Sequence, residues 1–464
     1  MKTEFSLARL ADDPQLATSE KILRTCVHCG FCNATCPTHL LLGDELDGPR
    51  GRIYLIKDML EKDLPASKEV VTHVDRCLSC LSCMTTCPSG VHYMHLVDQA
   101  RARIERTFKR SWHDRLIRGV LSWVLPYPRR FRMALRAARV GRPLRGAIGA
   151  VPAIGPRMRA MLELAPRRLP SPPKQHAGQV FPAIGECKKR VALLVTCAQP
   201  VLDPEINEAT IRLLNRLGVE VVLTKGEGCC GALVHHMGKE TESLRFATSN
   251  IDAWFAEIDG EGLDGIIITA SGCGTTIKDY GHLLRNDPIY AARAAHVSAL
   301  AMDISELLEG LDLPPGHPQS SLKVAYHSAC SMQHGQQLKD GPKRLLEAAG
   351  FEVAIVPEGH ICCGSAGTYN ILQPRIANEL RDRKVRNIKL TQPDIVATGN
   401  IGCMVQIASG DGTNRLGVPV VHTVELIDWA TGGPLPRTLQ GLELPAPENR
   451  TRLVKPEVDS VSAI

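Results

Sequence analysis

The chain has 464 residues, 17 of them cysteine, with few aromatic residues and a formal net charge of +6. This length is too great for one ordinary domain, and closely spaced cysteines in a long chain exclude the disulfide framework of a small secreted protein. Because the first residues lack an apolar signal core and no long uncharged apolar stretch occurs, we expect a cytoplasmic chain without a membrane span.

A short N-terminal segment, 1–20, precedes the first predicted domain at 21–105. That domain contains two runs of the form CxxCxxCxxxCP, the spacing of bacterial ferredoxins. Between the runs, apolar residues recur at helical spacing and predict one helix; these are Ile53, Leu55, Ile56, Met59 and Leu60. We therefore expect a small helical domain around two cysteine loops.

These runs predict two [4Fe-4S] clusters, because three thiolates of each run bind one cubane and the fourth crosses to the other. Cluster 1 is then bound by Cys26, Cys29, Cys32 and Cys87. Cluster 2 is bound by Cys77, Cys80, Cys83 and Cys36. Zinc is the alternative metal for CxxC pairs, but the doubled run with its trailing proline disfavours zinc. Haem attachment is not indicated, because the sequence contains no CxxCH motif.

A basic segment follows at 106–186, where proline-broken amphipathic stretches predict helices and then a linker. Residues 101–190 contain 22 Lys and Arg against four acidic residues, a local charge of about +18. Together with Trp112, Trp123 and Tyr127, this composition suits an anionic membrane surface or acidic partner subunits, and the sequence leaves both open. No nucleic-acid-binding motif accompanies the charge, so we expect no nucleic acid partner.

Alternating strands and helices then predict two α/β domains, at 187–310 and 311–435, before a C-terminal tail at 436–464. The predicted strands are 191–196, 219–224, 264–270, 323–327, 351–356 and 394–399. The halves are an internal duplication, because Cys330 follows Cys197 by 133 residues and Cys403 follows Cys273 by 130. Each cysteine comes just after a strand, where parallel sheets place ligand sites.

Eight cysteines of the repeats are therefore candidate metal ligands: Cys197, Cys229, Cys230, Cys273, Cys330, Cys362, Cys363 and Cys403. A glycine follows each adjacent pair and lets both sulfurs face one metal group. The alternative is that these thiols pack as small apolar side chains. Cys187 lies outside the repeat register, and we expect it to be unligated.

Other polar residues near the cysteines have two interpretations each. The histidines His235, His236, His327 and His334 could ligate metal or relay protons, but loop histidines are more often solvated or hydrogen-bonded, so we leave them out of the ligand set. Arg50 and Arg52 could raise the potential of a nearby cluster or bind a partner, or could be exposed arginines in a glycine turn.

Several phrases give this sequence a resemblance to one family: GDELDGPRGRIYLIK, RCLSCLSCMTTCPSG, EGCCGALVHH and CCGSAGTYN. Over residues 21 to 430 the chain resembles the glycolate oxidase iron–sulfur subunits, which join a two-cluster ferredoxin domain to two cysteine-rich domains named after the CCG motif. The resemblance implies a multi-domain fold, with a small α-helical bis-[4Fe-4S] ferredoxin-like domain followed by two repeated α/β CCG domains.

The resemblance also implies a function, as the electron-transfer subunit of a glycolate dehydrogenase complex. FAD-containing partner subunits would oxidise glycolate to glyoxylate, and the final acceptor would be a membrane quinone, with the chain peripheral on the inner face of the cell membrane. We expect no catalytic residue in this chain, which has no GxGxxG after a strand. An equivalent subunit for D-lactate or glycerol 3-phosphate, or a stand-alone iron–sulfur redox sensor, are the alternatives.

One departure from the family pattern concerns the last cysteine of each CCG module. Complete modules end in CxxC, whereas Thr276 and Gln406 stand three residues after Cys273 and Cys403. Each repeat thus offers four cysteines rather than five. Whether the repeats bind additional iron–sulfur clusters, as ordinary four-ligand clusters or as partly ligated centres, is left open by the sequence.

Overall fold

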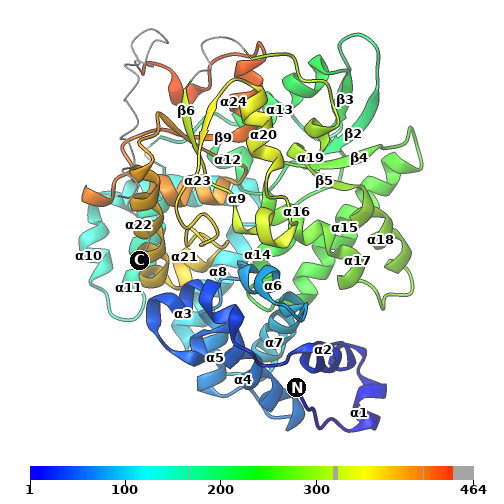
Figure 1. The fold of residues 1–464 in the computed structure, drawn as a ribbon, viewed down its shortest axis with the longest axis vertical. Coiled ribbons are helices and arrows are strands. Elements are labelled where there is room, and N and C mark those ends of the chain that lie inside the picture. Colours follow the sequence, from blue (N-terminus) through cyan, green and yellow to red (C-terminus); the bar gives the residue numbers. More distant parts are fainter. Residues whose placement is uncertain (167, 317–321, 411, 443–464) are drawn as a thin grey trace, which may run out of the picture.

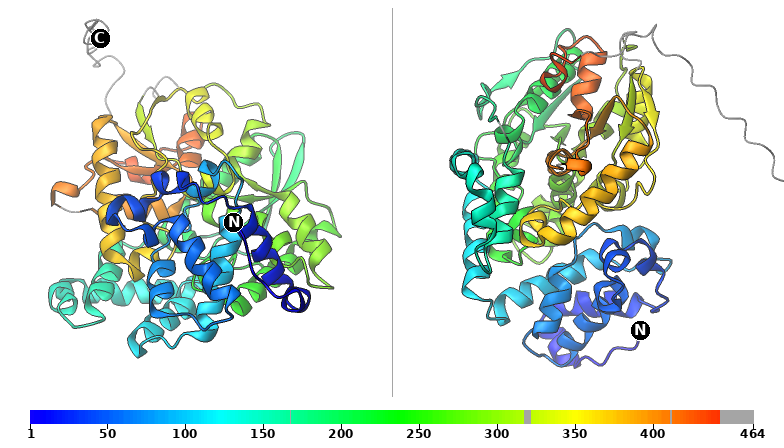
Figure 2. Two further views of the ribbon diagram at one scale, coloured as in Figure 1. Left: turned by 60° about the horizontal axis from the view of Figure 1, so that its bottom comes forward. Right: turned by 90° about the vertical axis from the view of Figure 1, so that its left-hand side faces the viewer.

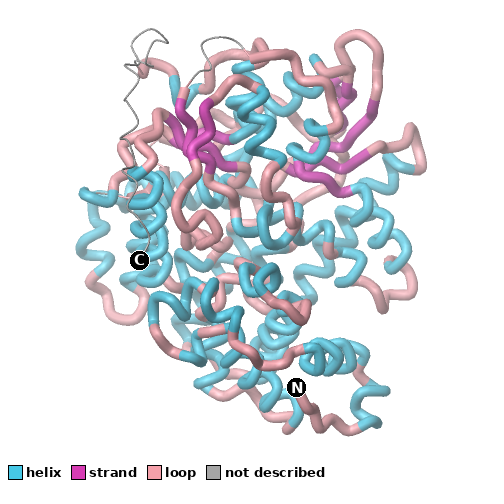
Figure 3. Tube along the Cα trace, in the orientation of Figure 1, coloured by secondary structure: helices cyan, strands magenta, loops and turns pink. Residues whose placement is uncertain are grey.

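The computed structural model describes residues 1–166, 168–316, 322–410 and 412–442, so most of the predicted C-terminal tail lies outside the described residues. The N-terminal helical part lies below two α/β halves, and a row of helices runs along their side (Figures 1 and 2). Strands form two separate sheets, one in each half (Figure 3). The predicted fold class is confirmed.

The N-terminal part is built of short helices around the two cysteine runs. They are α1 (Leu7–Asp12), α2 (Pro14–Thr25), η1 (Phe31–Thr35), α3 (Pro37–Leu42), η2 (Glu45–Asp47), α4 (Pro49–Glu61), α5 (Lys68–Asp75), α6 (Ser82–Thr86) and α7 (Tyr93–Thr107). Helix α4 is the helix predicted between the runs, and Pro49 favours its first turn. Its apolar face is buried against α2, α5 and α7, while α2 spans the expected boundary at residue 20.

The basic segment forms helices, as predicted. They are α8 (Trp112–Val124), α9 (Pro128–Gly141), η3 (Arg142–Leu144), α10 (Arg145–Gly149) and α11 (Gly155–Leu164). The start of α8 is fixed by Arg110 and Arg118, which both bind Asp75 of α5 and Asp114 of α8. This largely buried ion network joins the row of helices in Figure 2 to the N-terminal part.

The first α/β half contains a five-stranded sheet of order β1-β3-β2-β4-β5, in which only β1 is antiparallel to its neighbour. Its strands are β1 (Val180–Phe181), β2 (Lys189–Leu193), β3 (Val219–Val222), β4 (Gly265–Ile268) and β5 (Ala301–Asp303). Its helices are α12 (Gln199–Leu202), α13 (Glu205–Arg216), α14 (Ala232–His235), α15 (Glu240–Ile258), α16 (Ser271–Lys278), α17 (Tyr280–Leu283), α18 (Ala291–Leu300) and α19 (Ile304–Glu309).

The second half repeats this sheet without the antiparallel strand, in the order β7-β6-β8-β9. Its strands are β6 (Lys323–Tyr326), β7 (Glu352–Ala354), β8 (Ile395–Thr398) and β9 (Val420–His422). Its helices are η5 (Ser331–Gly335), α20 (Gly341–Ala348), α21 (Tyr369–Leu372), α22 (Pro374–Leu390), α23 (Ile401–Ala408), η6 (Gly412–Asn414), α24 (Thr423–Ala430) and η7 (Arg437–Leu439). The matching strand order supports the duplication.

One apolar core runs through both halves, since residues of β2, β3 and α13 belong to the same buried cluster as residues of β6, β8 and α24. Helix α13 packs directly on α24, and Arg212 and Arg216 of α13 both bind the buried Asp428 of α24. The two α/β halves are thus joined by packing as well as by the chain. Within the described residues, no helix is long and apolar enough to span a bilayer.

Candidate metal centres

Four cysteines of the N-terminal part, here called group 1, line a cavity that Cys83 also borders: Cys26, Cys29, Cys32 and Cys87. Three come from the first run and one from the second, which is the crossed set expected for cluster 1. Burial, followed by the neighbouring Cys26 and Cys87, raises the pKa of the Cys32 thiol to about 11. Thiolates in such a cavity need a cation for stability, and an iron–sulfur cluster would supply it.

The remaining four cysteines of the two runs, here called group 2, are all buried: Cys36, Cys77, Cys80 and Cys83. They form the set expected for cluster 2. Burial is the main cause that raises the pKa of the Cys83 thiol well above its usual value, with Cys80, Cys77 and Cys36 as further causes. The Tyr93 hydroxyl donates a hydrogen bond to the Cys77 Sγ at 3.8 Å.

Both cysteine loops share an unusual backbone conformation. The residue before the second cysteine and the residue after it have positive φ angles in each run, at His28 and Gly30 (60° and 86°) and at Ser79 and Leu81 (50° and 63°). A left-handed conformation costs roughly 1–2 kcal/mol at a residue with a side chain. The repeated strain fits a loop that wraps its sulfurs around a bound group.

Arg52 lies beside group 2 and is 1% exposed. It donates hydrogen bonds to the His73 carbonyl (2.7 Å) and the Thr38 hydroxyl (2.9 Å), and its Nη1 lies 3.8 Å from the Cys36 Sγ. The interpretation of Arg52 as an exposed arginine in a glycine turn is therefore wrong, because the residue lies within α4 and faces inward. The carboxylate of the fully buried Asp47 balances the charge of Arg52, with 3.5 Å between Asp47 Oδ1 and Arg52 Nη2.

The first CCG site consists of Cys197, Cys229, Cys230 and Cys273. The neighbouring thiol of Cys229, followed by burial, raises the pKa of Cys197 well above its usual value, and the thiols of Cys229 and Cys273, followed by burial, do the same for Cys230. The four residues follow β2, β3 and β4, at the carboxyl ends of parallel strands. The four candidate cysteines of the first repeat therefore lie together at one site.

The second CCG site consists of Cys330, Cys362, Cys363 and Cys403. The Sγ atoms of Cys330 and Cys362 lie 3.7 Å apart, and those of Cys363 and Cys403 lie 3.5 Å apart. Gly364 has a φ of 89°, and a Cβ there would lie 2.4 Å from the Ala377 carbonyl oxygen. A glycine is therefore needed for both sulfurs of the adjacent pair to face inward.

Neither residue at the fifth-cysteine positions is available to a metal as a ligand in the present geometry. The Gln406 amide donates to the Ala377 carbonyl and accepts from Asn370, and the Thr276 hydroxyl donates to the Gly272 carbonyl. Cys187 is exposed, and its thiol donates to the Lys189 carbonyl.

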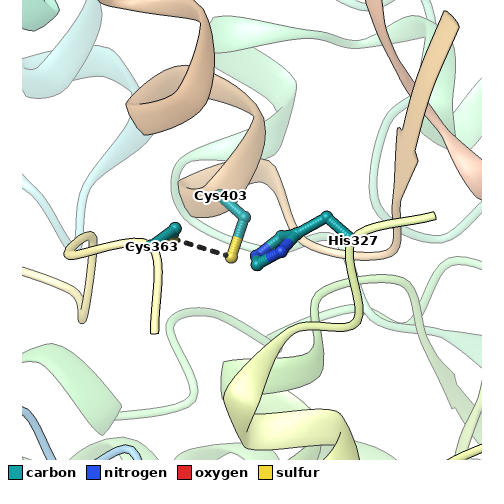
Figure 4. Close-up of side chains that lie close together, drawn as sticks. All are labelled: His327, Cys363 and Cys403. Carbon is teal, nitrogen blue, oxygen red and sulfur yellow. Dashed lines mark hydrogen bonds between the residues drawn. The ribbon is translucent and has the colours of Figure 1, made fainter. Parts of the chain in front are cut away.

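Three of the four histidines considered from the sequence have surroundings that do not point to metal. His235 binds Asp98 of α7 at 3.2 Å, and His236 beside it is buried with its pKa lowered to about 4, first by desolvation. The ring of His334 contacts the Thr85 hydroxyl and the His360 carbonyl. His327, in contrast, lies among sulfurs of the second CCG site (Figure 4).

Group 2 and the second CCG site are neighbours. Cys80 and Cys362 belong to one buried apolar cluster, against which Cys330 packs. The charges of these thiols also act on one another, since Cys330 contributes to raising the pKa of Cys80 after desolvation. Tyr369 fixes the contact by donating a hydrogen bond to the Arg76 carbonyl at 2.8 Å. Cysteine sulfurs thus continue from group 1 through group 2 to the second α/β half.

Family models match both parts of this arrangement. Residues 25–91 match the 4Fe-4S dicluster domain, and residues 191–278 and 324–408 each match the Cysteine-rich domain. Among solved structures, a hypothetical protein from Helicobacter pylori superposes with a TM-score of 0.52 at 11% identity, covering 84% of this chain and 69% of that one. At that identity the likeness concerns the fold alone.

Sequence identity to curated proteins is higher than to this solved structure, and for two of them it extends over 93% of the chain. The Escherichia coli K12 "Glycolate oxidase iron-sulfur subunit" is 42% identical over 431 residues, which cover 93% of this chain and 99% of that protein. The Bacillus subtilis "Probable glycolate oxidase iron-sulfur subunit" is 31% identical, with the same coverage of both chains. "Lactate utilization protein A" of Geobacillus kaustophilus is 30% identical over 52% of this chain and 98% of its own length.

Proposed function

The chain belongs to the family of glycolate oxidase iron–sulfur subunits, and we propose that it conducts electrons from flavin-containing subunits, which oxidise glycolate to glyoxylate, towards a membrane quinone. Its role as an iron–sulfur electron-transfer subunit of an oxidoreductase complex follows from this membership and from the 4Fe-4S dicluster region. Substrate chemistry belongs to the partner subunits in this proposal, and bound clusters supply one-electron carriers to this chain.

We assign the cysteines of group 1 and group 2 as the ligands of two [4Fe-4S] clusters, and those of the two CCG sites as ligands of further centres. The observation that supports this proposal is the spatial order of the sulfurs. Group 1 includes the exposed Cys29, group 2 is wholly buried, and Cys80 of group 2 packs in one cluster with Cys362. Such an order suits a path that carries electrons from the surface inward.

Group 1 is the proposed point where electrons enter. Three exposed apolar side chains lie near Cys29: Val27 and Phe31, each two residues away in the chain, and Tyr54, whose ring centroid is 6.4 Å from that of His28. An apolar surface beside a redox centre suits a docked protein. Arg50, which binds Glu45 at 2.6 Å, adds charge at the same rim. We propose that the flavin-containing subunit docks here.

Helix α8 carries the proposed membrane contact, on the inner face of the cell membrane. Trp112, Leu116, Val120 and Trp123 are exposed and recur at i, i+4, i+8 and i+11, so they share one helix face. Arg130 of α9 stacks over the Trp123 ring at 4.7 Å from its centroid. An apolar stripe bordered by arginines is typical of a helix that lies on an anionic bilayer surface.

Glycolate-dependent dye reduction by the purified complex tests the substrate. Activity with D-lactate or glycerol 3-phosphate but not with glycolate would contradict the proposal, as would purification of this chain without a flavin-containing partner, which a stand-alone sensor predicts.

Iron counting on anaerobically purified protein tests the cofactors. The two cubanes account for about eight irons, so an excess would belong to the CCG sites. Cys230→Ser and Cys363→Ser should lower that excess and leave the two cubane signals intact, whereas loss of all signals together would indicate misfolding.

A further inference from the structure

His327 occupies an unusual position at the second CCG site. The side chain comes directly after β6, is 2% exposed, and neither ring nitrogen has a hydrogen-bond partner. One of its nitrogens and the Sγ atoms of Cys363 and Cys403 all lie within 4.8 Å of one another, and Figure 4 shows the ring pointing at the Cys403 sulfur. The backbone N–H of His327 donates to the Ala397 carbonyl at 2.8 Å, which fixes the residue on the sheet.

The fold itself does not explain a histidine here. A buried polar group without a hydrogen-bond partner destabilises the folded state. The offset of 133 residues places Leu194 at the equivalent position of the first repeat, where it is fully buried after β2. An apolar side chain therefore suits this position, and the second repeat carries an unpartnered imidazole in its place.

We propose that His327 is a nitrogen ligand of the metal centre in the second CCG site. The inference rests on the proposed ligation of a metal by Cys330, Cys362, Cys363 and Cys403. Imidazole is a common ligand of iron and zinc, and its neutral form has a free lone pair directed at the metal. His327 would thus provide a fifth donor in the second repeat, where the Gln406 amide is held by Ala377 and Asn370.

The two CCG sites would then hold chemically different centres. The first offers four thiols around Leu194, and the second offers four thiols and an imidazole. Compared with a complete CCG module, where a fifth thiolate would stand, a neutral imidazole leaves the centre with one negative charge fewer and so raises its reduction potential. Because the second site adjoins group 2, a raised potential there would draw electrons out of the two cubanes.

The test compares the wild-type protein with His327→Leu, which reproduces the residue of the first repeat, and His327→Cys, which restores a metal ligand without nitrogen. His334→Gln is the matched control, because His334 is also buried near Cys330 but both its ring nitrogens contact protein groups. Iron, zinc and sulfide are counted per chain. Metal-edge X-ray absorption and pulsed EPR on protein labelled with ¹⁵N-histidine report directly bound nitrogen.

We expect His327→Leu to lose metal from the second site together with the nitrogen signal, while the two cubane EPR signals remain. His327→Cys should retain the metal without the nitrogen signal, and His334→Gln should behave as wild type. Equal metal content and unchanged spectra in His327→Leu would overturn the inference, as would wild-type protein with no metal beyond the two cubanes. Glycolate-dependent dye reduction, assayed separately, distinguishes these outcomes from failure of the proposed function.

Discussion

Arg52→Gln removes a buried positive charge next to group 2 and keeps a hydrogen-bonding side chain. At 3.8 Å from Nη1 to the Cys36 Sγ and an effective dielectric constant of about 20, two unit charges interact by about 4.4 kcal/mol. For one electron this corresponds to roughly 190 mV, at 59 mV per tenfold change in the equilibrium constant. That value is a ceiling, because the electron added on reduction spreads over a whole cluster and Asp47 opposes the arginine.

We therefore expect the reduction potential of the cluster at group 2 to fall by a few tens of millivolts, on the order of a quarter of that ceiling. The assay is a redox titration followed by EPR, with Arg52→Lys as the variant that keeps the charge and Arg50→Gln as the control at group 1. An unchanged potential in Arg52→Gln would refute the reasoning. Equal shifts in Arg52→Gln and Arg52→Lys would assign the effect to hydrogen-bond geometry instead of charge.

Gly364→Ala should lower the iron content of the second CCG site, because its Cβ would lie 2.4 Å from the Ala377 carbonyl at a φ of 89°; unchanged iron would contradict this. Burial raises the pKa of Asp303 to about 6 in the folded protein, from about 3.8 in the unfolded chain. The protonated carboxyl therefore stabilises the fold fully below pH 3.8, and this stabilisation is lost as the pH rises through 6. Asp303→Asn should flatten the fall in denaturation midpoint between pH 4 and 7, and an equally steep fall would argue against it. The double variant Trp112→Ser, Trp123→Ser should sediment severalfold less with anionic vesicles but keep its dye reduction unchanged. Equal sedimentation of variant and wild type would contradict a membrane contact through this face of α8.

Local patterns predicted most of the fold. The six predicted strands are present. Five are shortened at one or both ends, and β2 begins two residues before the predicted start and ends three residues before the predicted end. The helix of Ile53 and Leu60 lies where the periodicity indicates. The strands β5 and β9 have three residues each, too few for periodicity to register, and β1 has two. Sheet pairing with β4 and β8, which lie far away in the sequence, determines β5 and β9.

The candidate sites were predictable as far as cysteine spacing allows. The structure brings together the two crossed sets and both repeat sets, whereas their ligation stays a prediction. The burial of Arg52 was not foreseen, because its partners Asp47 and His73 lie on other elements. His327 had one sequence signal, the leucine at its counterpart in the first repeat, but its nearness to Cys403 depends on how β6 and α23 pack.

The core shared by the two α/β halves has a consequence for biosynthesis. Apolar residues of α13 are covered by α24, near the end of the described chain, and Asp428 there is bound by Arg212 and Arg216. During translation, the apolar face of α13 therefore stays exposed to solvent until about 200 further residues have left the ribosome. The N-terminal helices have their own apolar core and can close earlier, so cluster loading can begin before synthesis of the second half is complete.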